Sequence, residues 1–68
     1  MIAGDLVFLP QGTTVILKGE VVGLKKPEFG ILLKLNERVG WNKIWFFGAI
    51  PGAHEAHGKI YKYNGEKI

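Results

Sequence analysis

Ten glycines, spread almost evenly along the chain, divide this sequence into short segments. The runs between them are rich in Val, Ile, Leu, Phe, Trp, Tyr and Thr, a composition that favours strands bounded by tight turns. No window of 11 or more residues has apolar side chains at the i, i+3, i+4, i+7 spacing of an amphipathic helix. The glycine spacing therefore predicts an all-β fold.

Five strands are expected, over residues 5–9, 13–24, 29–35, 38–47 and 59–63. A glycine inside a strand marks a bend or bulge, so Lys18-Gly19-Glu20 would bend the second segment or divide it into two strands that meet at a corner. Asn36-Glu37 is expected to reverse the chain between the third and fourth strands. Residues 48–58 are expected to form a connector, with room for one short helical turn.

The chain has 68 residues, which is enough for a single domain, residues 1–68. A flat sheet of five short strands cannot hide its apolar faces, whereas a closed sheet removes its edges and buries more surface. We therefore expect a small five-stranded antiparallel barrel. There is no cysteine, which excludes disulfides and thiolate-bound zinc. Stability must then come from core packing or from a partner.

Two short motifs carry a resemblance to known small barrels. Gly4-Asp5-Leu6-Val7, followed by Lys18-Gly19-Glu20-Val21-Val22, is similar to the opening strand and next glycine of KOW-type modules. Gly40-Trp41, followed by Gly48-Ala49-Ile50-Pro51, resembles the tryptophan and late proline of SH3 domains. The chain thus resembles the SH3-like small β-barrels. It lacks the Ala-Leu-Tyr-Asp-Tyr opening of the peptide-binding SH3 domains and reads Pro51-Gly52-Ala53-His54 where their late motif is Pro-x-x-Tyr. The resemblance therefore implies the architecture and does not extend to proline-peptide binding.

Both tryptophans and two of the four phenylalanines lie close together in the fourth predicted strand. On a straight strand Trp41, Lys43, Trp45 and Phe47 share one face and Phe46 lies on the other. Each large aromatic side chain buries about 150–250 Å², so one small core cannot hide all four. Packing of at least two of them in the core is expected. The aromatic side chains that do not fit in the core are expected to form a surface that docks a larger protein partner. The residues of this predicted surface are Trp41, Lys43, Trp45 and Phe47.

A nucleic-acid-binding barrel is the alternative function. Single-stranded nucleic acid is bound by stacking on aromatic rings, at about 1–3 kcal/mol per base, together with neutralisation of phosphates. The net charge of +3 is compatible with such a ligand. The residues of this alternative site are Lys25, Lys26, Lys59, Tyr61, Lys62 and Tyr63. A self-associating structural subunit, for example a homodimer, is a further alternative that would also cover surplus aromatic surface.

The inventory for catalysis and metal binding is poor. The chain has neither serine nor cysteine, and its carboxylates are scattered, so we expect no enzyme and no cofactor. His54 and His57 would contact a divalent metal only if their segment formed a helical turn and a distant carboxylate completed the site. An exposed polar loop is the favoured interpretation of that segment.

Lys18, Lys34 and Lys43 interrupt the apolar segments, so no apolar run approaches the ~20 residues that span a membrane. The first residues lack the basic region and long apolar stretch of a secretory signal. We therefore expect a cytoplasmic protein with no membrane partner.

Overall fold

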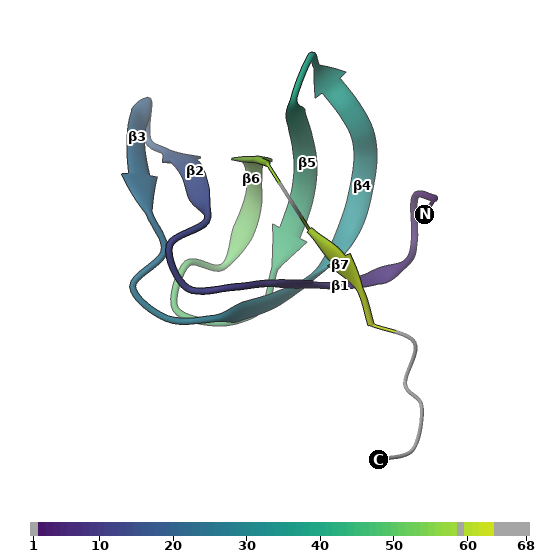
Figure 1. Ribbon diagram of the computed structural model, residues 1–68, viewed down its shortest axis with the longest axis horizontal. Coiled ribbons are helices and arrows are strands. Elements are labelled where there is room, and N and C mark those ends of the chain that lie inside the picture. The colour runs from purple at the N-terminus through teal and green to yellow at the C-terminus, as the bar shows by residue number, and fades with distance from the viewer. Residues whose placement is uncertain (1, 59, 64–68) are drawn as a thin grey trace.

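The computed structural model describes residues 2–58 and 60–63, which form one antiparallel sheet (Figure 1). The strands are β1 (Leu6–Leu9), β2 (Thr14–Leu17), β3 (Glu20–Gly23), β4 (Glu28–Arg38), β5 (Trp41–Phe46), β6 (Gly52–His57) and β7 (Tyr61–Lys62). Their order in the sheet is β3-β2-β6-β5-β4-β1-β7. In this described part of the chain there is no helix that could span a membrane.

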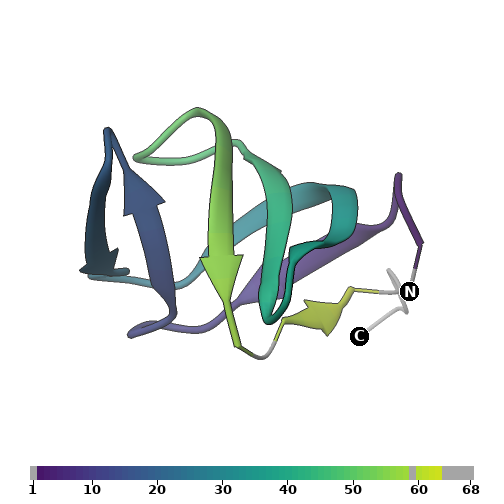
Figure 2. The ribbon, with the colours of Figure 1, turned by 90° about the horizontal axis from the view of Figure 1, so that it is seen from above.

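The all-β prediction is confirmed, but the sheet differs from the expected five-stranded closed barrel. It has seven strands, and its end strands β3 and β7 are not paired with each other in the described residues. One extra strand arises because the segment 13–24 is a hairpin and not a bent strand. Lys18 and Gly19 both adopt left-handed backbone, with φ of 50° and 83°, which allows a reversal in two residues. Figures 1 and 2 show the β2–β3 hairpin at one end of the curled sheet and β7 at the other.

The helical turn expected in residues 48–58 is wrong, because β6 occupies most of that segment and pairs with both β2 and β5. The physical reason is a match of small against large residues. Ala53 lies opposite Trp45, and Gly52 lies opposite Phe46. A strand of small side chains fits beside the bulky ones of β5, so tertiary context overrides the low intrinsic strand preference of this segment.

The prediction of a chain reversal at Asn36-Glu37 is also wrong. The third predicted strand continues as β4 to Arg38, and the turn into β5 falls at residues 39–40. Asn36 instead adopts a φ of 56° within an irregular stretch of β4, where the register with β5 shifts. Its backbone N–H donates a hydrogen bond of 2.9 Å to Oδ1 of the buried Asn42. A side chain on the neighbouring strand therefore satisfies a donor that the regular ladder would have paired.

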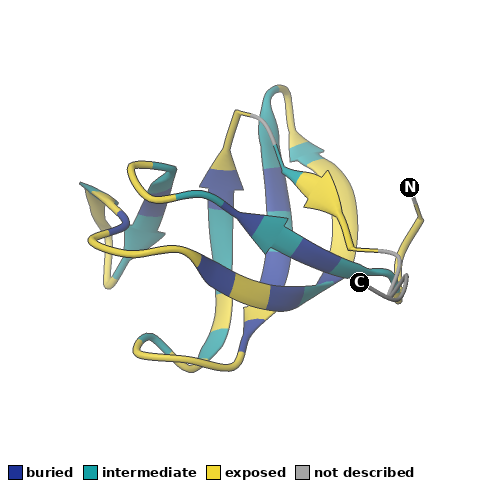
Figure 3. Cartoon of the chain, turned by 60° about the horizontal axis from the view of Figure 1, so that its bottom comes forward, coloured by how far each residue is buried: buried dark blue, intermediate teal, exposed yellow. Residues whose placement is uncertain are grey.

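Buried and more exposed residues alternate along β1, β5 and the first half of β4, as the colours of Figure 3 show. One face of the curled sheet forms the core, and we call the opposite face the outer face. The buried hydrophobic side chains are Val7, Leu9, Val15, Leu24, Leu32, Ile44, Phe46 and Ala56. Of the four phenylalanines, two tryptophans and two tyrosines, only Phe46 is buried. The expectation that at least two of the four aromatic side chains at 41–47 pack in the core is therefore wrong, because the core takes only Phe46 from this segment.

Candidate docking site

The strand registers align two rows of side chains on the outer face. The first row contains Tyr63, Leu6, Ile31, Trp45 and Ala53. The second row contains Tyr61, Phe8, Phe29 and Phe47. None of these nine side chains is charged, and together we call them the aromatic face. Five strands therefore contribute to one continuous apolar surface.

Several rings of the aromatic face are open to solvent. The exposed fractions are 43% for Phe29, 47% for Trp45, 55% for Phe47, 50% for Tyr61 and 39% for Tyr63. Neighbouring rings contact one another. The Phe8 and Phe29 centroids lie 5.2 Å apart, and those of Phe29 and Tyr63 lie 5.6 Å apart with an interplanar angle of 83°. Such tilted and edge-to-face pairs are favourable ring geometries, so the rings support one another in place.

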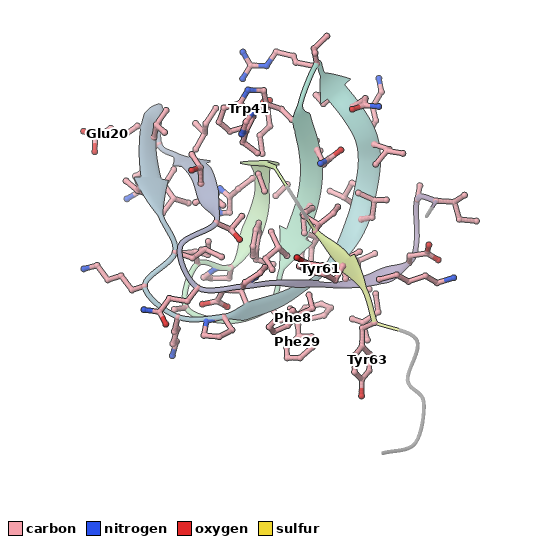
Figure 4. The ribbon with its side chains drawn as sticks, viewed as in Figure 1. Phe8, Glu20, Phe29, Trp41, Tyr61 and Tyr63 are labelled. Atoms are coloured by element: carbon pink, nitrogen blue, oxygen red, sulfur yellow. The ribbon has the colours of Figure 1, made fainter. Side chains whose placement is uncertain are left out.

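The predicted site on β5 is divided between two environments. Trp45 and Phe47 belong to the aromatic face, whereas Trp41 lies at the start of β5 and packs against polar groups. Its ring centroid is 4.8 Å from that of His57 and 5.8 Å from the Arg38 guanidinium carbon. Figure 4 shows Trp41 at the opposite end of the sheet from the neighbouring Phe8 and Phe29. Trp41 is therefore outside the apolar surface that sequence reasoning assigned to it.

Charged residues separate these two environments. Lys43 lies opposite Lys34 on β4 and Glu55 on β6, between the two tryptophans. Glu55 Oε1 accepts hydrogen bonds from Arg38 Nη2 at 2.6 Å and Nε at 3.1 Å. This pair lies beside Trp41, and being largely exposed it contributes little to stability. The charged side chains of Lys43, Glu55 and Arg38 therefore form the border of the aromatic face on the side of Trp41.

The residues of the predicted nucleic-acid site are only partly brought together. Tyr61 and Tyr63 join the aromatic face, whereas Lys62, opposite the buried Val7, lies on the other face of the edge strand β7. Lys26 lines a shallow hollow that also contains Phe29 and Phe47, at another border of that face. Lys25 lines a different pocket, between β3 and the loop after β5, which Lys26 also borders. Lys59 lies outside the described residues.

The two histidines are not brought together. They are three positions apart on β6, so their side chains leave opposite faces of the strand. The His54 ring packs 5.8 Å from Phe46, and the His57 ring packs against Trp41. Within residues 2–58 and 60–63, no three potential metal-ligating side chains cluster. The arrangement gives no support to a shared metal ion.

Sequence reasoning missed Phe8 and Phe29, which lie at the centre of the aromatic face. Phe8 alternates with the buried Val7 and Leu9, and this alternation was a usable signal that its ring points away from the core. No local signal could place Phe29 next to it, because that contact depends on the pairing of β1 with β4.

Comparison of the chain with protein-family models, with curated proteins and with solved structures finds no match. The candidate site therefore rests on the geometry of this chain.

Collisional quenching of single-tryptophan variants tests the aromatic face directly. The variant Trp41→Phe retains Trp45, which is 47% exposed. We expect its fluorescence to be quenched more strongly by acrylamide than that of Trp45→Phe, which retains the less exposed Trp41 packed against His57. If both indoles were equally and strongly protected from acrylamide, the exposure of Trp45 on the aromatic face would be contradicted.

Proposed function

We propose that this protein is a non-enzymatic binding module that docks onto a larger protein through its aromatic face. The observation that carries the proposal is the run of nine uncharged, largely aromatic positions across five strands. Protein interfaces are distinguished at their centre by this combination, depletion of charge with enrichment of Tyr, Trp and Phe. Leu6 and Ile31 lie among the rings, which favours a protein as the partner. The apolar side chains of a protein surface pack against aliphatic and aromatic side chains alike.

The charges around the aromatic face suggest the chemistry of the partner. Lys26 and Lys43 lie at its borders, and in the described part of the chain no carboxylate lies within 4.0 Å of their ammonium groups. An apolar surface rimmed by Asp and Glu would complement this arrangement. A second copy of the chain would bring the lysines of both copies into one interface, so the proposal favours a different, acidic-rimmed partner.

The test begins with recovery of the partner from the native cell, using the wild-type protein and the variant Trp45→Ser/Phe47→Ser. The affinity of the captured protein, once purified, is then measured by calorimetry. Truncation of a central aromatic side chain typically costs about 2 kcal/mol or more, so we expect a loss of at least about 30-fold. Lys26→Glu/Lys43→Glu should also weaken binding, and the wild-type affinity should fall as salt is added.

Val39→Ser is the matched control, because Val39 is an apolar side chain 96% exposed at the β4–β5 turn, outside the aromatic face. It should bind the partner as the wild type does. A captured protein that binds Trp45→Ser/Phe47→Ser with unchanged affinity would refute docking through this face. So would a wild-type dimer in sedimentation that the same variant abolishes, because the face would then join two copies.

Single-stranded nucleic acid is the second candidate ligand. It is favoured by the row of Tyr61, Phe8 and Phe29 with Lys26 near its Phe47 end, since rings and lysines together bind bases and phosphates. Binding of the wild type to a single-stranded oligonucleotide should then fall steeply with salt. The variant Tyr61→Ser should bind the oligonucleotide more weakly than the wild type. This measurement uses the purified protein and the oligonucleotide alone.

We further propose that the architecture of this chain is related to that of the SH3-like small β-barrels. It is supported by the short chain, the antiparallel strands and the curl of the sheet around one core.

A further inference from the structure

The outer edge of β3 has backbone groups available for another strand. β3 is the last strand of the sheet and pairs only with β2. Leu24, which follows it, is in register with Thr13 and donates its N–H to the Thr13 carbonyl at 2.8 Å. In an antiparallel ladder every second residue bonds to the partner strand, so Val22 and Glu20 also face β2. The N–H and C=O groups of Val21 and Gly23 consequently point away from the sheet.

An apolar pocket lies beside this edge on the core side of the sheet. Its volume is about 450 Å³, within the range of about 300–1,000 Å³ that is usual for ligand sites. Leu17, Val22, Leu24 and Ile50 line it. Three of these, Leu17, Val22 and Ile50, pack against the core and remain only half-buried. The pocket is therefore core surface left uncovered where the sheet does not close.

The rim of this pocket is basic. Lys25 and Lys26 follow β3, line the pocket and are exposed. Across the described residues, no carboxylate lies within 4.0 Å of either ammonium group. The one acidic side chain in the lining, Glu28, is buried, and its carboxylate abuts Gly48. The groups available to a ligand at the mouth are therefore positively charged.

We propose that the β3 edge binds an extended peptide that carries a bulky apolar side chain flanked by acidic residues. The peptide adds a strand to the sheet through hydrogen bonds to Val21 and Gly23, the mode known as β-augmentation. Its apolar side chain enters the pocket over Val22 and Leu24, and its carboxylates face Lys25 and Lys26.

This peptide site is separate from the aromatic face. β3 lies at one end of the strand order, and none of its residues belongs to either row of the aromatic face. Lys26 borders both sites. The variants that separate them are therefore Gly23→Pro for the peptide site and Trp45→Ser/Phe47→Ser for the aromatic face. A second copy of the chain is a poorer occupant of the β3 edge, because two edges paired in this way would bring the lysines of both copies into one interface.

The test uses a fluorescent, end-capped peptide of sequence Glu-Glu-Thr-Val-Thr-Phe-Thr-Glu-Glu, followed by anisotropy against the wild-type protein. Its alternation places valine and phenylalanine on one face of a strand. The control peptide has lysine in place of each glutamate. We expect the wild type to bind the acidic peptide at least about tenfold more tightly, because only that peptide complements Lys25 and Lys26.

Two variants locate the binding. Lys25→Glu/Lys26→Glu changes exposed side chains only and should reverse the preference between the two peptides. Gly23→Pro removes one outward N–H from an edge strand, a position where proline is tolerated, and should abolish binding of both peptides. Gly23→Ala keeps the N–H and serves as its control. Thermal melts of each variant show whether the fold is retained.

Three results would overturn the proposal. The first is equal affinity of the wild type for the acidic and basic peptides, or no binding of either at millimolar concentration. The second is unchanged binding by Lys25→Glu/Lys26→Glu, a result that does not depend on how well Gly23→Pro folds. The third is a wild-type dimer in sedimentation that Gly23→Pro abolishes, since a second copy would then occupy the edge.

Discussion

Replacement of Phe46 with alanine is expected to lower the free energy of unfolding by about 3–5 kcal/mol. Phe46 is the largest fully buried side chain, with 1% of its surface exposed. Its removal loses the transfer free energy of the ring and leaves a cavity that its neighbours fill only in part. Because a chain of this size has a total stability of only roughly 3–10 kcal/mol, this single change consumes much of the margin.

Phe47 provides the matched control, since it is the next residue along the chain and 55% of its surface is exposed. Phe47→Ala is expected to change stability by less than about 1 kcal/mol. Urea denaturation followed by circular dichroism measures both variants. Equal losses of stability in the two variants would mean that the alternation between core and outer face is misassigned at this end of β5.

Gly30→Ala is expected to have the second-largest effect, with a loss of about 3 kcal/mol, the upper end of the usual overpacking cost. A Cβ atom at Gly30 would lie 2.5 Å from the Trp45 carbonyl oxygen and 2.6 Å from Ile44 Cγ2. The first of these neighbours is backbone, so a side-chain rotation cannot relieve the clash. The thermal midpoint should fall by at least about 12 °C, at roughly 4–8 °C per kcal/mol for a domain of this length.

Gly23→Ala is the control for this substitution. Both glycines lie in strands and neither has a positive φ, so the backbone conformation itself does not penalise alanine at either position. At Gly23 the nearest atom to a new Cβ is the Gly12 carbonyl oxygen, at 3.7 Å, which is an ordinary contact. Its melting temperature should remain close to that of the wild type. A similar fall in both variants would indicate a general cost of losing glycine and not a clash at Gly30.

The division of β5 into two faces was predictable from the sequence. Alternation places Trp41, Trp45 and Phe47 on one side and Phe46 on the other, and the structure buries Phe46 while Trp45 and Phe47 remain exposed. The sequence also contained the reason for an exposed apolar surface, because the rings exceed what a small core can hold. Alternation alone could not decide which of two apolar faces becomes the core.

The segment of β6 shows where local reasoning failed. Gly-Ala-His-Glu-Ala-His has no β-branched residue, yet it forms a strand with a partner on each side. The deciding factor is the opposition of Ala53 to Trp45 and of Gly52 to Phe46. This fit involves residues from another strand, so no property of the segment itself could reveal it.

The amino-acid order by itself determined that the chain is all-β, which side chains share a strand face, and that its aromatic rings outnumber the available core positions. Only the tertiary structure decided that Phe8, Phe29, Tyr61 and Trp45 meet on one surface, and that the sheet stays open beside β3. The reason is the range of the interactions. Side-chain alternation follows from the local geometry of one strand, whereas register and closure depend on hydrogen bonds and packing between segments far apart in the chain.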